Sequence, residues 1–391
     1  MRCSRRAFCL AGAAAIAESR MGGAAVSVDP EVPWLADAQR PPRLPDPKAA
    51  VLKPFLDEDG RPITSLNGWL ERRKVLHQAW VDFLKPLDLP RNKPKLTVLA
   101  EDRSDGCIRR IVQYESEPGE TVEGCLIKPE AISGKRPGVV VLHPTTVGTF
   151  REPAGFEGDR YGAFGLRLAQ RGMVTFSPRC FLWGNSAALL QPEPGPERKR
   201  STPAVDSKDR DRRVEELGRR HPGTKGMAKM LWDASRGLDV LESLGEVESS
   251  RMGAIGHSLG AKETLYLAGF DQRVRAAVFS EGGIGIHYSN WNAPWYLGPD
   301  IDRPDFGREH HELLALAAPR AMLLVAGESG GPNPRGVDDG DRSWPFVEAV
   351  LPVYRLYGGP ARVGLLNHRQ GHVVPPQTAE RIYDWLETYL S

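Results

Sequence analysis

The strongest constraint on the fold is an alternation of short apolar runs and helical patterns, which begins near residue 138 and continues to the C-terminus. "GVVVLHP" at residues 138–144 is continuously apolar, as expected of a strand buried on both faces of a parallel sheet. Similar runs follow, separated by segments whose apolar residues repeat at helical spacing: "MVTFSP", "RMGAIG", "VRAAVFS", "AMLLVAG" and "RVGLLN". This alternation predicts an α/β protein with a doubly wound, mostly parallel sheet and helices on both faces.

The N-terminal residues 1–27 are predicted to be an export signal. They combine a basic start with an Ala-rich apolar run, and "SRRAF" at residues 4–8 resembles the twin-arginine signature. The alternative is a basic N-terminus of a cytosolic protein. The apolar run at residues 7–17 is too short to span a bilayer, so we expect no stable membrane anchor. The favoured interpretation places the mature protein in the periplasm or outside the cell.

The remaining chain divides into two parts. Residues 28–95 form a proline-rich arm followed by a helical pattern at residues 65–84, and residues 96–391 form the predicted catalytic domain. An insertion at residues 187–225 is dense in Pro, Arg, Asp and Glu. It is interpreted either as a solvated insertion or as a lid over the active site.

Composition excludes several classes of function. The 391 residues are 40% hydrophobic and 26% charged, as in an ordinary soluble globular protein. A formal net charge of +2 gives no support for a nucleic-acid partner. The cysteines show no paired spacing that would indicate a metal site, and no metal is expected.

A serine between two glycines carries the first chemical signal. In "RMGAIGHSLGAKETLYLAG", Ser258 lies between Gly256 and Gly260, where a strand pattern changes to a helix pattern. A tight strand-to-helix turn exposes its central side chain, and small neighbours relieve the strain of that turn. This is the Gly-x-Ser-x-Gly nucleophile elbow in its expected context. A helix-capping serine without catalytic function is the plainer alternative.

A serine hydroxyl needs a base, and in this arrangement the base follows the last strand. "LLNHRQGH" supplies His368 and His372. His372 follows Gly371 on a loop that can reach back over the strand ends, so we predict that it is the base. His368 lies closer to the strand and is predicted to have a packing or supporting role.

The acid that orients the histidine has two possible locations. Glu281 follows "VFS" at a strand end and precedes two glycines. The segment after the next strand supplies further carboxylates, namely Glu328, Asp338, Asp339 and Asp341. Either location could orient His372 and stabilise its imidazolium form, so spacing alone leaves this choice open.

The oxyanion of the reaction also needs donors. The helix after Ser258 directs its positive end toward the reaction centre, and the amide of Leu259 is the first predicted donor. The second should come from the loop after the first buried strand, from the amides of Thr145 or Thr146. His143 in this loop could tilt toward a substrate or have a structural role.

From about Leu96 to the C-terminus the sequence resembles the α/β-hydrolase superfamily, in its dienelactone-hydrolase and acetyl-xylan-esterase-like branch. It is also similar to the glucuronoyl methylesterases. The resemblance is carried by "GHSLGAK", "SEGG", "NAPWYLG", "HHELLALAAPR" and the terminal "GH". It implies that the acid is Glu281, with Asp341 as the alternative.

The same resemblance implies two substrate-binding residues. Lys262 falls where those esterases carry a substrate-contacting lysine, and Trp295 matches an aromatic residue of their sugar site. A surface lysine and a core aromatic are the plainer interpretations. Leu259 stands where those esterases usually carry arginine, which puts uronate specificity in question.

These observations together predict an exported serine hydrolase that cleaves carboxylic esters of small molecules or carbohydrates through a Ser258–His372–acid triad and an acyl-enzyme, without a cofactor. A peptidase of the prolyl-oligopeptidase type uses the same chemistry, but no propeller-like repeat precedes the catalytic part. A non-catalytic carbohydrate-binding relative is the alternative from another functional class.

Overall fold

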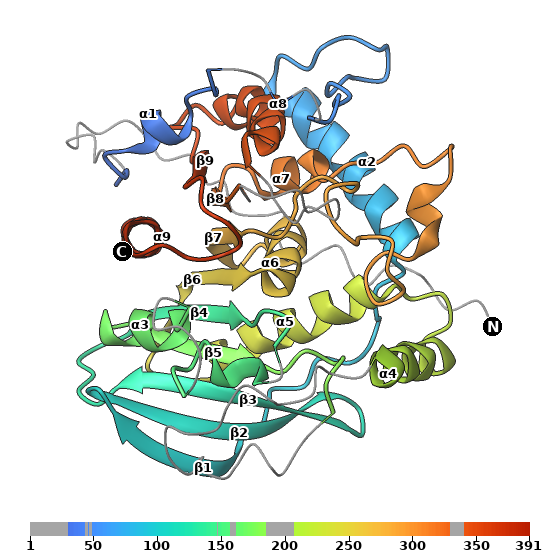
Figure 1. The fold of residues 1–391 in the computed structure, drawn as a ribbon. Coiled ribbons are helices and arrows are strands. Elements are labelled where there is room, and N and C mark those ends of the chain that lie inside the picture. Colours follow the sequence, from blue (N-terminus) through green and yellow to red (C-terminus); the bar gives the residue numbers. More distant parts are fainter. Residues whose placement is uncertain are drawn as a thin grey trace.

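A single nine-stranded sheet organises the molecule, with the strand order β1-β2-β3-β5-β4-β6-β7-β8-β9 (Figure 1). We describe it from a computed structural model, in which the described residues are 30–43, 46, 49–146, 148–156, 162–184, 207–328 and 340–391. The expected export signal at residues 1–27 therefore lies outside the described residues, as do residues 185–206 of the charged insertion.

The sheet has an antiparallel part and a parallel part. The antiparallel part consists of β1 (Thr97–Ser104), β2 (Cys107–Glu117) and β3 (Glu120–Pro129), and β3 pairs antiparallel with β5. The parallel strands are β4 (Arg136–Leu142), β5 (Val174–Pro178), β6 (Val247–His257), β7 (Val274–Ser280), β8 (Ala321–Ala326) and β9 (Val363–Asn367). The predicted doubly wound, mostly parallel sheet is confirmed.

Helices cover both faces because successive strand side chains point to opposite sides. In β4, Val140 and Leu142 belong to one buried apolar cluster, whereas Val139 and Val141 belong to the other. The first cluster includes side chains of α2 (Leu66–Leu84), α5 (Gly226–Glu242), α6 (Leu259–Phe270), α7 (His311–Ala317) and α8 (Trp344–Arg355). The second includes side chains of α1 (Leu35–Ala38), α3 (Phe164–Gln170) and α9 (Pro376–Tyr389).

The helix predicted at residues 65–84 packs onto the sheet domain as α2. Ser65 caps it, because its side chain accepts a hydrogen bond from the Gly68 amide at 3.2 Å. Trp69 and Trp80 are fully buried, and the Trp80 indole donates to Glu312 Oε2 at 2.7 Å. Helix α2, which precedes the antiparallel strands in the chain, is therefore part of the main core.

Three elements were not predicted from the sequence, and the first of them is helix α1, which lies in the proline-rich arm. Strand β1 extends the antiparallel edge of the sheet. Helix α4 (Ser207–Arg220) forms within the insertion at residues 187–225, for which the sequence predicted no element. Part of that insertion is therefore a regular helix, and Figure 1 shows it beside the end of the β2–β3 hairpin.

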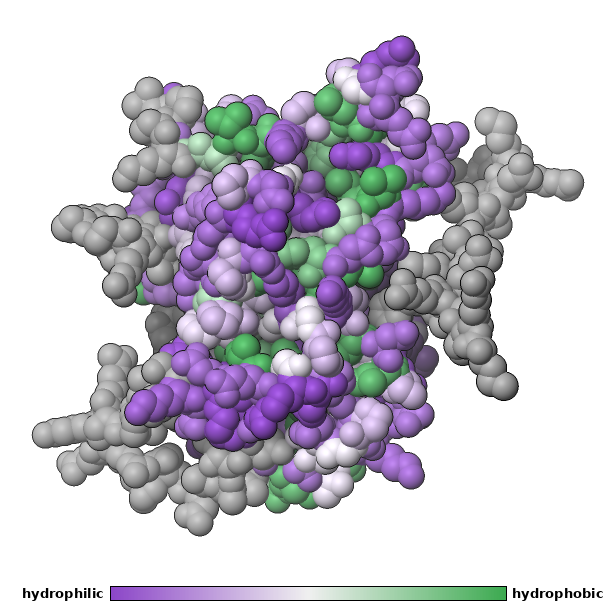
Figure 2. Space-filling model, turned by 90° about the vertical axis from the view of Figure 1, so that its right-hand side faces the viewer, coloured by the Kyte–Doolittle hydropathy of each residue, from purple (hydrophilic) through white to green (hydrophobic). Residues whose placement is uncertain are grey.

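None of the helices in the described part of the chain is long and apolar enough to cross a membrane. The face shown in Figure 2 is mostly hydrophilic, with smaller hydrophobic patches between the hydrophilic areas.

Candidate active site

Ser258 lies alone between strand β6 and helix α6, in a sharp turn. Its φ of 58° and ψ of −114° are unusual for a residue with a side chain. The Ser258 amide donates to the Ser280 carbonyl at 2.8 Å, which ties the turn to the end of β7. This is the strained strand–turn–helix geometry in which a nucleophile elbow exposes its serine.

The two flanking glycines allow the turn to close. A β-carbon on Gly256 would lie 2.2 Å from the Gly260 backbone, and one on Gly260 would lie 2.0 Å from the Leu142 carbonyl oxygen. Both distances are far below van der Waals contact with backbone atoms that cannot rotate away. Helix α6 can therefore approach the end of β4 only when both positions are glycine.

We expect the Gly260→Ala variant to lose about 2–4 kcal/mol of unfolding free energy, because its methyl group would displace α6 from β4. Urea unfolding followed by tryptophan fluorescence measures this loss. Gly245→Ala is the matched control, since a β-carbon there meets no atom within 4 Å. Equal stability of the two variants would contradict the close approach.

Glu281 begins the loop that follows β7 and contacts two histidines. Its φ is 55°, and its amide donates to the Val325 carbonyl at 2.9 Å. Glu281 Oε2 lies 2.9 Å from His372 Nδ1, and Glu281 Oε1 lies 2.6 Å from His368 Nε2. The carboxylate is 1% exposed. The structure thus brings Glu281 together with both histidines of the C-terminal loop.

The two histidines differ in the hydrogen bonding of the ring nitrogen that does not contact Glu281. His368 Nδ1 accepts a hydrogen bond from the Gln370 amide at 3.2 Å, so His368 Nε2 carries the proton that Glu281 accepts. Within the described residues no hydrogen bond involves His372 Nε2. The His372 side chain is 35% exposed and that of His368 only 5%. Only His372 therefore keeps a ring nitrogen for proton transfer.

The charge of Glu281 follows from these contacts. Burial acts to raise the pKa of the Glu281 carboxyl, but the hydrogen bonds from His368 and His372 outweigh it and hold that pKa below its ordinary value. Glu281 is consequently a carboxylate at neutral pH. A carboxylate in this position can stabilise a protonated His372.

Asp341, the alternative acid, binds elsewhere. It accepts hydrogen bonds from Asn367 Nδ2 at 2.9 Å and from the Arg369 guanidinium at 2.7 Å. Glu328 binds the same two side chains, at 2.7 and 2.9 Å. These carboxylates hold the residues on either side of His368. Asp338 and Asp339 lie outside the described residues.

His257 is a residue of this site that the sequence analysis did not identify. Its ring lies 4.7 Å from the His372 ring, at an interplanar angle of 33°, and its Nδ1 lies 3.0 Å from Ser280 Oγ. Burial, and secondarily the neighbouring His372, lower the pKa of His257 to about 4. A neutral imidazole thus packs against His372. The signal was present in the sequence, because His257 fills the variable position before Ser258.

The described residues contain one group of side chains that could hold a metal ion. Candidate ligand atoms of His257, Glu281 and His372 all lie within 4.8 Å of one another. A metal ion there would have to replace the proton between Glu281 and His372.

The predicted oxyanion donors lie at two chain segments. Leu259 is the first residue of α6, so its amide has no intrahelical acceptor. In the loop after β4, the Thr146 amide donates to the Pro144 carbonyl at 2.8 Å and is already engaged. Thr145 is exposed in the same loop.

His143 has a structural role in this loop. Its Nε2 accepts from the Cys180 amide at 3.0 Å, so its Nδ1 carries the proton and donates to the Pro144 carbonyl at 2.7 Å. Burial lowers the pKa of His143 to about 4. The neutral ring links the ends of β4 and β5.

Lys262 is buried, at 3% exposure, and is not the surface residue of the plainer interpretation. Its Nζ donates to Ser289 Oγ at 2.9 Å and lies 3.8 Å from the centre of the Trp291 ring. Trp295 is half-buried, and the Arg210 guanidinium lies 5.0 Å from its ring centre. The two predicted substrate-binding residues share one neighbour, because the Tyr296 ring centre lies 5.2 Å from Lys262 Nζ and 6.1 Å from the centre of the Trp295 ring.

The sheet and its covering helices define an α/β-hydrolase fold. No protein-family model and no curated protein sequence matches the chain. Solved structures do match. A glucuronoyl esterase from Solibacter usitatus is 16% identical, with a TM-score of 0.63 over 88% of this chain and 99% of its own.

Two further structures agree on the fold. A glucuronoyl esterase from Teredinibacter turnerae is 20% identical, with a TM-score of 0.62 over 87% of this chain and 89% of its own. An acetyl xylan esterase from Paenibacillus sp. R4 is 18% identical, with a TM-score of 0.52 over 86% of this chain and 97% of its own. At these identities the matches establish the shared fold, and the resemblance inferred from sequence motifs is confirmed at that level.

Proposed function

We propose that this protein is an exported serine hydrolase that cleaves carboxylic esters, with carbohydrate esters as the natural substrates. One observation carries the proposal: the buried Glu281 carboxylate contacts Nδ1 of His372, and the His372 ring packs against the residue that precedes Ser258. In the same turn Ser258 has the backbone geometry of a nucleophile elbow.

In the proposed mechanism His372 Nε2 takes the hydroxyl proton as Ser258 Oγ attacks the ester carbonyl carbon. Glu281 stabilises the resulting imidazolium. The amides of Leu259 and Thr145 bind the oxyanion of the tetrahedral intermediate, since the Thr146 amide already donates to the Pro144 carbonyl. His372 then donates its proton to the leaving alcohol, which gives an acyl-enzyme. Water attacks that intermediate with His372 again as the base, and the carboxylic acid leaves. None of these steps needs a cofactor.

The substrate class rests on the structural neighbours, which are esterases of glucuronoyl and acetyl-xylan groups by name. Leu259 cannot supply the charged contact expected from arginine at the position after the serine. We therefore propose a carbohydrate ester without assigning its acyl group. The basic and apolar segment at residues 1–27 supports export to the periplasm or the medium.

A fluorophosphonate probe tests the proposal directly. We expect the probe to label the protein once, on the proteolytic peptide that contains Ser258, and the Ser258→Ala variant to remain unlabelled. We also expect turnover of p-nitrophenyl acetate at a rate well above that of a peptide anilide. Failure to label would favour a non-catalytic carbohydrate-binding protein, and preferential cleavage of the anilide would favour a peptidase.

A further inference from the structure

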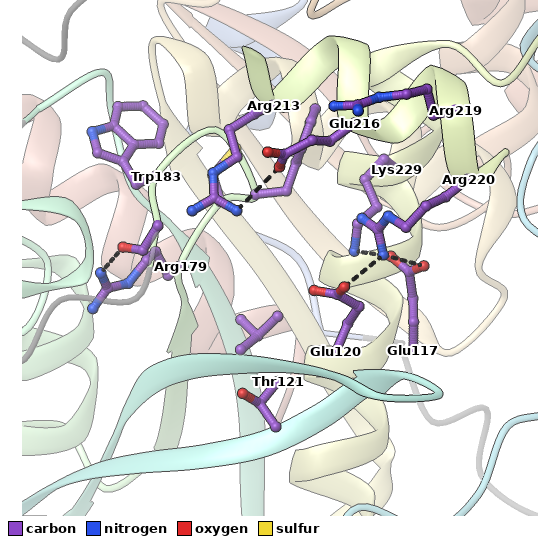
Figure 3. A pocket seen from close by; sticks show the side chains of 14 residues that line it. Glu117, Glu120, Thr121, Arg179, Trp183, Arg213, Glu216, Arg219, Arg220 and Lys229 are labelled. Atoms are coloured by element: carbon purple, nitrogen blue, oxygen red, sulfur yellow. Dashed lines mark hydrogen bonds and ion pairs between the residues drawn. The ribbon is translucent and has the colours of Figure 1, made fainter. Parts of the chain in front are cut away.

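A cavity lies outside the proposed triad. It is a cavity of about 630 Å³ between the β2–β3 hairpin, the segment after β5 and helix α4. Figure 3 shows Trp183 and Arg179 on one side of it, Glu117 and Arg220 on the other, and Arg213 projecting between them. Nothing in the proposed hydrolysis steps uses these residues.

The cavity is adjacent to the proposed active site. Cys180, in its wall, donates its amide to His143 Nε2 at 3.0 Å. The carbonyl oxygen of His143 in turn lies 3.0 Å from the position of a β-carbon on Gly260. One hydrogen bond and one backbone contact therefore connect the cavity wall to the turn that carries Ser258.

The lining is rich in cations. Five lining side chains are basic and three are acidic: Arg179, Arg213, Arg219, Arg220 and Lys229 against Glu117, Glu120 and Glu216. The Glu117 side of the cavity is balanced, because Glu117 pairs with Lys229 at 2.6 Å and with Arg220 at 3.2 Å. The excess positive charge consequently lies on the other side.

That excess is centred on α4. Arg213, Glu216 and Arg219 occur at intervals of three along the helix and all line the cavity. Arg213 reaches Glu216 only at 3.6 Å, and Glu216 is also bound by Arg212 at 2.8 Å. The Glu216 carboxylate is thus shared between the guanidinium groups of Arg212 and Arg213. No ion pair of Arg219 with another described residue is present.

A second arginine, Arg179, lines the same side of the cavity, although a carboxylate compensates its charge. Arg179 is 2% exposed and pairs with the buried Glu123. Burial lowers the pKa of Arg179, Glu123 opposes that effect, and the nearby Arg213 guanidinium lowers it further. Two guanidinium groups therefore repel each other at one side of the cavity. A bound anion would relieve this repulsion.

The remaining wall is suited to a sugar ring. Phe181 and Trp183 supply aromatic surface, and Trp183 is fixed by an edge contact with the His143 ring at 5.0 Å. An aromatic face packs against the apolar face of a sugar, while carboxylates such as Glu120 accept hydrogen bonds from hydroxyl groups. Guanidinium groups bind planar carboxylates through two parallel hydrogen bonds.

We propose that this cavity binds a sugar that carries a free carboxylate, as part of the carbohydrate chain next to the cleaved ester, with Arg213 and Arg219 contacting the carboxylate. The assignment to a substrate chain rests on the proposed esterase function. Binding of the acidic sugar itself does not.

Isothermal titration of the full-length Ser258→Ala protein tests the proposal, because this variant cannot turn over a ligand. The probes are trigalacturonate and the neutral maltotriose. We expect trigalacturonate to bind at least about 10-fold more tightly, a difference that added salt reduces. Adding Arg213→Gln and Arg219→Gln should weaken trigalacturonate binding to the level of maltotriose.

Arg103→Gln together with Arg355→Gln, in the same Ser258→Ala background, is the charge-matched control, since both arginines are exposed and line none of the described cavities. It should leave both affinities unchanged. Thermal unfolding of every variant separates lost binding from lost folding. Equal binding of both probes, equal effects of the paired and control variants, or equally tight binding of a sulfated trisaccharide would each overturn the proposal. These outcomes do not involve hydrolysis, so they are distinguishable from a failure of the esterase function.

Discussion

Replacing Ser258 by alanine is expected to lower kcat for p-nitrophenyl acetate by about 10⁴-fold or more, because it removes the proposed nucleophile while leaving the rest of the site in place. The turn should survive the substitution. Alanine retains the β-carbon that Ser258 already accommodates at a φ of 58°. The unfolding free energy should therefore change by less than about 1 kcal/mol. Steady-state kinetics and thermal unfolding of the same preparation check both expectations.

Ser280→Ala provides the control for this experiment. Ser280 is a fully buried serine at the end of the neighbouring strand, and its hydroxyl lies 3.0 Å from His257 Nδ1. We expect its loss to reduce kcat by less than about 10-fold, as for a single neutral hydrogen bond. If Ser258→Ala kept a tenth or more of the wild-type rate, Ser258 could not be the nucleophile.

The parallel strands were predictable because burial on both faces leaves a plain signal. All six residues of β8 are buried, and the sequence there is continuously apolar. Strand β1 gives no such signal, because most of its residues are exposed and several are charged. It is held by backbone pairing with β2 at the sheet edge. Its existence depends on a partner that the local sequence does not reveal.

Helix α4 was not predicted because its sequence also lacks a clear apolar pattern. Among residues 208–220, whose burial the structure describes, only Leu217 is fully buried, and charges of both signs surround it. A pattern with so few apolar positions resembles a solvated loop. Ion pairs between side chains of the same helix, such as that between Arg212 and Glu216 at 2.8 Å, stabilise α4. The sequence shows that the insertion is highly charged, but it does not indicate that part of the insertion is helical.

The candidate site was predictable in part. The glycines around Ser258 identified the turn because their spacing reflects a steric requirement within a few residues. The choice between Glu281 and Asp341 could not be made from spacing, because both follow the ends of adjacent parallel strands, β7 and β8. Which carboxylate reaches His372 depends on loop paths that only the folded structure contains.

Glu281→Gln is expected to lower kcat by about 10³–10⁴-fold, and Asp341→Asn by only a few fold. In wild type, the Glu281 carboxylate lies 2.9 Å from His372 Nδ1, so Nδ1 carries a proton and Nε2 is free to accept one. Glutamine can keep its carbonyl toward the Nε2–H of His368, which directs its amide group toward His372. That amide donates a hydrogen bond and so favours the His372 tautomer with the proton on Nε2. This tautomer cannot take a proton from Ser258, and no negative charge remains to stabilise the imidazolium.

Asp341→Asn removes the same charge from the adjacent strand end without touching His372. Its effect should be confined to the contacts with Asn367 and Arg369, which hold the loop beside His368. Measuring kcat and unfolding free energy for both variants separates catalysis from loop stability, because the glutamine variant should lose rate at nearly constant stability. A large loss of rate in Asp341→Asn together with a small one in Glu281→Gln would identify Asp341 as the acid. In that case the Glu281–His372 contact would be a structural hydrogen bond, and the C-terminal loop would have to rearrange for His372 to act as the base.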